Sequence, residues 1–107
     1  MKNTVACVIF VVAALLEVGG DAIIRRGLRN SGPLLIITGF VVLGCYGLVV
    51  NSVKWDFSKM LGVYVAVFAV ISILCGHLVF RESVPFSTWA GLSIIILGGL
   101  IIQFGSR

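Results

Sequence analysis

Four long apolar runs divide this chain, and short polar patches separate them. The runs cover residues 5–24, 33–53, 60–80 and 84–104. Each is close to the ~20 residues that a helix needs to cross a hydrocarbon core of ~30 Å. A soluble chain of 107 residues has too little core to hide four helices that are apolar on every side. The pattern therefore predicts an all-α membrane protein, with four transmembrane helices in one domain, residues 1–107.

The composition agrees with a membrane protein, at 60% hydrophobic and 11% charged residues. A signal peptide is the alternative for the first run, because Lys2 precedes it. However, Glu17 and Asp21 stand where a small-residue cleavage site would be. We therefore expect the first run to remain as a helix of the protein.

The net charge of +4 is better explained by loop charges that orient helices than by a nucleic-acid partner. With four spans and both termini on one side, the basic residues divide equally between the two sides of the membrane. Lys2, Lys54, Lys59 and Arg107 lie on one side, and Arg25, Arg26, Arg29 and Arg81 lie on the other. This balance is compatible with insertion in both orientations and with an antiparallel homodimer. A coincidental balance is the alternative.

Glu17 is the most unusual residue of the first run. A carboxylate inside an apolar span costs on the order of 2.5–3.5 kcal/mol, so its presence indicates a function. Snorkelling to the interface is the weaker interpretation, because Glu is short and Asp21 follows one turn later. Desolvation disfavours the charged form, so we expect Glu17 to carry a proton in one step and a cation in the next. That is the minimal chemistry of proton/cation exchange.

Glu17, Asp21 and Arg25 are spaced four residues apart and share one helix face. Ala13 and Gly20 lie on or beside the same stripe and leave room for a ligand or for a neighbouring helix. For Asp21 and Arg25, an ion pair at the membrane boundary is an equally good interpretation.

Glycines and aromatic residues supply the remaining candidates. Gly91 and Gly98 are seven residues apart and predict a close helix–helix contact, either between subunits or within one. Trp55 and Trp89 lie near span ends, as interfacial Trp does. Tyr64 is the better candidate for an aromatic wall beside an organic cation, whereas lipid-facing or core packing suits Tyr46 equally well.

The other reactive residues predict no enzyme chemistry. Cys7, Cys45 and Cys75 are odd in number and show no metal-ligand spacing, so we expect buried free thiols. His77 has no second ligand type near it in the sequence, and a satisfied interfacial histidine is expected. No nucleophile–base pair or phosphate loop appears. We therefore expect no enzymatic activity, no metal and no cofactor.

Residues 13–20, Ala-Ala-Leu-Leu-Glu-Val-Gly-Gly, resemble the first-helix signature of the small multidrug resistance transporters. Residues 80–83, 89–91 and 95–99 resemble the closing helix of that family and of the wider drug/metabolite transporter superfamily. The resemblance runs over nearly the whole chain.

The resemblance implies an antiparallel homodimer in a bacterial or archaeal cytoplasmic membrane, with protons and small organic cations as ligands. Glu17 would bind both in turn, and Ala13 and Gly20 would line its pocket. Tyr64 falls where that family usually has a Trp, and Gly91 and Gly98 match its dimer contacts.

The chain also departs from that family. Residues 54–59 lack its usual Pro and Tyr, residues 66–68 replace a small-residue kink, and Asp21 stands where an uncharged residue is common. A carrier of another metabolite or of a lipid-linked headgroup, using Arg25, Arg26 and Lys54, is therefore an alternative. A non-transporting accessory protein is another.

Overall fold

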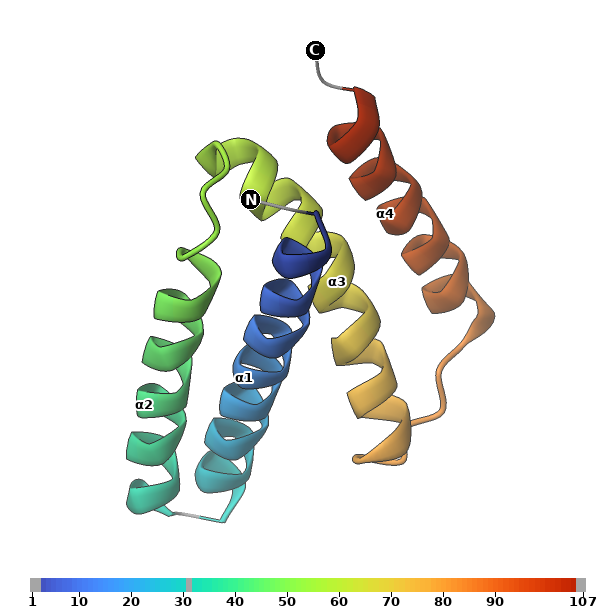
Figure 1. Cartoon of the computed structure of the whole chain (residues 1–107). Coiled ribbons are helices and arrows are strands. Elements are labelled where there is room, and N and C mark those ends of the chain that lie inside the picture. The colour runs from blue at the N-terminus through green and yellow to red at the C-terminus, as the bar shows by residue number, and fades with distance from the viewer. Residues whose placement is uncertain (1–2, 31, 106–107) are drawn as a thin grey trace. The chain divides into compact units, whose positions relative to one another are not determined.

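Four helices make up the computed structural model, which describes residues 3–30 and 32–105. They are α1 (Asn3–Arg29), α2 (Pro33–Val50), α3 (Phe57–Leu78) and α4 (Phe86–Gly105) (Figure 1). All four are long and apolar enough to cross a membrane. The predicted all-α fold with four membrane-spanning helices is confirmed.

The helix ends differ from the apolar runs because backbone hydrogen bonds decide them. α1 continues through the polar residues 25–29 and ends where the Gly32 N–H donates to the Gly27 carbonyl at 2.8 Å. α2 stops before residue 53, because after Asn51 the backbone N–H groups of Ser52 and Val53 donate to carbonyls three residues earlier instead of four. Pro33 opens α2 at a position where its missing N–H costs nothing.

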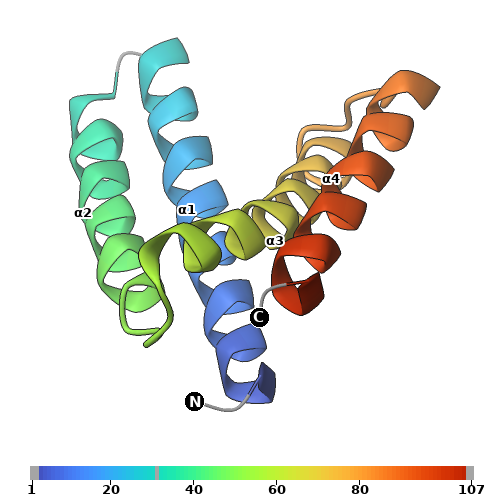
Figure 2. The same cartoon turned by 90° about the horizontal axis from the view of Figure 1, so that it is seen from above.

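The chain forms two compact units, Met1–Lys54 and Trp55–Arg107. The first contains α1 and α2, which run side by side in opposite directions in both views (Figures 1 and 2). The second contains α3 and α4, which also pack as a hairpin. Each unit is thus a pair of antiparallel helices.

Glycines set how closely α1 and α2 approach. A Cβ placed on Gly20 would lie 2.9 Å from the Leu43 side chain and 3.2 Å from the Gly39 carbonyl. A Cβ on Gly39 would collide with Ile24 and would lie 2.9 Å from the Gly20 carbonyl. The two backbones therefore touch at this level, as small residues allow in lipid.

The second hairpin uses the same principle. A Cβ on Gly99 would lie 2.8 Å from the Cβ of Ala66, and one on Gly62 would lie 2.8 Å from Ile102. By contrast, nothing lies within 4 Å of a Cβ at Gly91 or Gly98. Within the second unit, these two glycines are open on the surface of α4 and do not pack against α3.

The turn after α3 is held by Glu82. Its N–H donates to the Gly76 carbonyl at 3.0 Å, and its own carbonyl accepts from Nδ1–H of His77 at 3.1 Å. Arg81 enters this turn with φ 55. His77 is therefore satisfied at the end of its helix, as the sequence analysis expects.

Three hydroxyl groups within the spans are satisfied by their own helices, and large apolar side chains are exposed on the helices. The hydroxyls of Thr38, Ser72 and Ser93 donate to carbonyls three or four residues earlier, which leaves fewer donors facing hydrocarbon. Large exposed side chains such as Leu34, Phe40 and Ile94 suit contact with lipid tails.

The exposure of the cysteines differs from the expectation, and two of the basic residues fall outside the described range. The three cysteines are free, but Cys7 and Cys45 are exposed instead of buried. Cys7 lies on an outer face of α1, because the buried positions beside it are Ala6 and Phe10. Lys2 and Arg107, two members of the charge balance, lie outside the described residues.

The contact at Gly39 can be tested with one methyl group. We expect Gly39→Ala to lower the free energy of unfolding by about 1–3 kcal/mol, because the new Cβ overpacks against Ile24 and the α1 backbone. Gly44→Ala in the same helix is the control, since its Cβ would meet nothing within 4 Å. Circular dichroism during detergent-induced unfolding measures both. Equal effects of the two substitutions would contradict the close approach.

Candidate functional site

The candidate site lies within the α1–α2 hairpin, and Gly20 fixes its depth. The midpoint of α2 (Pro33–Val50) falls between Val41 and Val42. Gly20 packs against Gly39 and Leu43, which flank that midpoint. Gly20 of α1 therefore lies level with the middle of α2, the shorter helix of the hairpin.

Glu17 and Asp21 stand on either side of this level. Asp21 directly follows Gly20, and Glu17 precedes it by three residues, so both carboxylates belong to the middle of the apolar span. Glu17 is half-buried and Asp21 is exposed. This depth weakens the interpretation of Asp21 as a boundary residue.

Tyr46 of α2 is the residue that the sequence analysis did not select for this site. Its phenol lies close enough to both Glu17 and Asp21 to interact electrostatically with each carboxylate. The helix pairing explains this position, because Glu17 lies about as far before the turn at residues 30–32 as Tyr46 lies after it. Counting outward from that turn would have found Tyr46 from the sequence.

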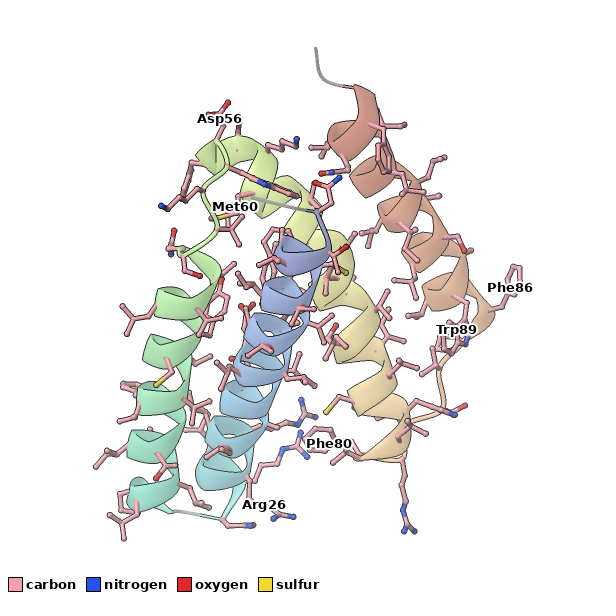
Figure 3. All side chains as sticks on the ribbon, in the orientation of Figure 1. Arg26, Asp56, Met60, Phe80, Phe86 and Trp89 are labelled. Carbon is pink, nitrogen blue, oxygen red and sulfur yellow. The ribbon has the colours of Figure 1, made fainter. Side chains whose placement is uncertain are left out.

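Three other candidates occupy the same helix. Ala13 and Gly20 are buried, and Arg25 is exposed one turn beyond Asp21. Arg26 lies near the loop end of the hairpin (Figure 3). The structure therefore gives Glu17 a neighbourhood of small residues, while the basic side chains gather near the end of α1. An Asp21–Arg25 ion pair stays a prediction.

Tyr64 belongs to the second unit. It is buried, and its ring centroid lies 6.2 Å from that of Phe68 at a tilted angle. Its role beside Glu17 stays a prediction. In the same unit the Lys59 ammonium lies 4.8 Å from the ring centroid of Trp55, and Trp89 is near the start of α4 (Figure 3). Both Trp residues are thus near helix ends, as interfacial Trp residues are.

The site chemistry is that of carboxylates and a phenol. Within residues 3–30 and 32–105, no group of three His, Cys, Asp or Glu side chains could hold a metal ion. Two carboxylates beside a phenol can bind protons, ammonium groups or other cations. What distinguishes them from ordinary surface acids is their depth in an apolar hairpin.

Comparison with known proteins identifies the family. Residues 4–107 match the family model described as "Uncharacterised BCR, YnfA/UPF0060 family". The chain belongs to the YnfA/UPF0060 family.

Relatives in the YnfA/UPF0060 family are similar over nearly their full length. The "UPF0060 membrane protein YfjF" of Bacillus subtilis is 30% identical, and the match covers 96% of each chain. A "UPF0060 membrane protein" of Staphylococcus carnosus is 35% identical over 92% of this chain and 94% of the relative. No solved structure matches the chain. Together with the four apolar helices, these names show a multi-pass membrane protein with bacterial relatives.

The pairing of Glu17 with Tyr46 can be tested by cross-linking. In a variant without the native cysteines, we expect Glu17→Cys and Tyr46→Cys to be joined within one chain by a short thiol-specific cross-linker. Glu17→Cys with Leu34→Cys is the control, because Leu34 lies at the other end of α2. The mass of the monomer band reports the product. Efficient cross-linking of the control pair alone would contradict the helix register.

Proposed function

We propose that this protein exports small organic cations in exchange for protons, by alternating access around Glu17. The observation that carries this proposal is the position of Glu17 and Asp21, beside one phenol and halfway along the apolar hairpin. A carboxylate at such depth is costly when charged, so it is stabilised by taking up either a proton or a cation. Competition between the two for one carboxylate couples their movements.

The proposed cycle has three steps. A cation displaces the proton from Glu17 on one side of the membrane. The protein then exposes the site to the other side, where a proton displaces the cation. Tyr46 helps to hold the cation, since its phenol lies within electrostatic reach of both carboxylates and an aromatic ring can attract a cation. The likeness of residues 13–20 to the small multidrug resistance signature supports this proposal and the wider link to drug/metabolite transporters.

We further propose that the working unit is an antiparallel homodimer. One chain has only two helical hairpins, and a second copy would supply another Glu17. The equal division of basic residues in the sequence supports opposite insertion of the two copies. Gly91 and Gly98 have open space above them on α4, which suits a helix of the second copy.

Transport driven by a pH gradient in proteoliposomes tests the proposed exchange. We expect Glu17→Gln to reduce proton-driven cation flux to the background of empty vesicles, because the amide cannot carry a proton in exchange for a cation. Asp56→Asn is the matched control, since Asp56 is an exposed carboxylate at the start of α3. Full proton-driven flux in Glu17→Gln would refute the proposal. If loss followed Arg26→Gln instead, transport of an anionic group would be favoured.

The proposed dimer contact is tested separately. We expect Gly98→Leu to weaken dimerisation by at least about tenfold, because the side chain fills the space left for the other subunit. Ser93→Leu is the control, as it adds bulk to another exposed face of α4. Fluorescence transfer between labelled chains, diluted in lipid, measures the dissociation constant. Unchanged dimerisation of Gly98→Leu would rule out this surface.

A further inference from the structure

We propose that the site prefers cations with two positive charges, specifically short aliphatic diamines, and that Asp21 determines this preference. The inference rests on the proposed function, because it concerns the substrate of the same site. Its basis is the placement of two carboxylates on neighbouring turns of α1, with one phenol of α2 within electrostatic reach of both.

The spacing of the two carboxylates suits a short diamine. Residues four apart on a helix are separated by about 6 Å along the axis and turned by about 40° about it. Glu17 and Asp21 therefore lie on neighbouring turns of one face. A chain of a few methylene groups can carry one ammonium to each carboxylate, whereas a single ammonium can contact one carboxylate fully and the other only weakly.

Tyr46 connects the two acidic positions from the opposite helix. Its phenol interacts electrostatically with both Glu17 and Asp21, so a ligand beside this ring lies within reach of both. Gly20 stands between the two acidic residues and packs against Leu43 and Gly39. Because the backbones touch there, α2 is held close to both carboxylates. The apolar side chain of Leu43 suits the methylene segment of a diamine.

Charge balance also favours a doubly charged substrate. Two neighbouring carboxylates halfway along a membrane-spanning helix are stabilised most fully when two positive charges neutralise them. Two protons or one diamine meet this requirement, but one monoamine leaves a negative charge. Exchange of one doubly charged diamine for two protons also moves no net charge across the membrane. The second carboxylate is therefore expected to change the substrate preference and the number of protons exchanged.

The test compares diaminobutane with butylamine, which has the same carbon chain and one ammonium group. Purified protein in a weakly buffered detergent solution is titrated with each amine, and affinity is measured together with proton release. We expect diaminobutane to bind at least about tenfold tighter, and to release about two protons where butylamine releases about one.

Variants then assign the preference to Asp21. We expect Asp21→Asn to bring the ratio of diamine to monoamine affinity close to one, and Asp21→Glu to keep a clear preference for the diamine. Asp56→Asn, at an exposed position outside the hairpin, is expected to behave like the unmodified protein. The helical circular dichroism spectrum confirms that each variant is folded.

The possible outcomes separate this inference from the proposed function. Proton release by both amines without a diamine preference would overturn the role of Asp21 and leave proton/cation exchange intact. Absence of proton release and of flux for any organic cation would overturn both. Tighter competition by magnesium or calcium ions than by diaminobutane would show an inorganic divalent site and overturn the diamine assignment.

Discussion

The backbone contact between α1 and α2 at Gly20 and Gly39 is the constraint on which the candidate site depends. A methyl group on Gly39 would collide with Ile24 and lie 2.9 Å from the Gly20 carbonyl, and one on Gly20 would crowd Leu43 and the Gly39 carbonyl. Hydrophobic burial provides little association between helices that are already in lipid, so close packing has to hold them. The same contact holds α2 where Tyr46 comes within electrostatic reach of the two carboxylates. Helix packing and site geometry therefore share one cause.

The fold could be predicted from the sequence because membrane thickness fixes the length of an apolar helix. The helix ends could not, because local hydrogen bonds decide them. α2 ends inside an apolar run, where the N–H groups of Ser52 and Val53 donate to carbonyls three residues earlier. At the other end, α1 continues through polar residues, since Arg is a good helix former and Gly27 packs against the start of α2. Hydropathy alone does not report either effect.

The site was only partly predictable for a related reason. A charge in an apolar run is visible in the sequence, so Glu17 could be found at once. Tyr46 was not selected, because α2 is apolar on all sides and its composition does not show which face meets α1. Only the pairing of the two helices shows it, and that pairing follows from the short turn after Asn30 and from the position of the buried glycines.

The exposure of Asp21 indicates what kind of medium surrounds this face of the hairpin. Asp21 directly follows Gly20, which packs beside the midpoint of α2, and its side chain is exposed. An ionisable group at that depth is strongly disfavoured against lipid tails, so such groups face a protein interior or a water-filled path. We therefore expect the face of α1 that carries Asp21 to meet protein or water instead of lipid tails. Water on this face would give the neighbouring Glu17 access to protons, which the proposed exchange of protons for cations requires.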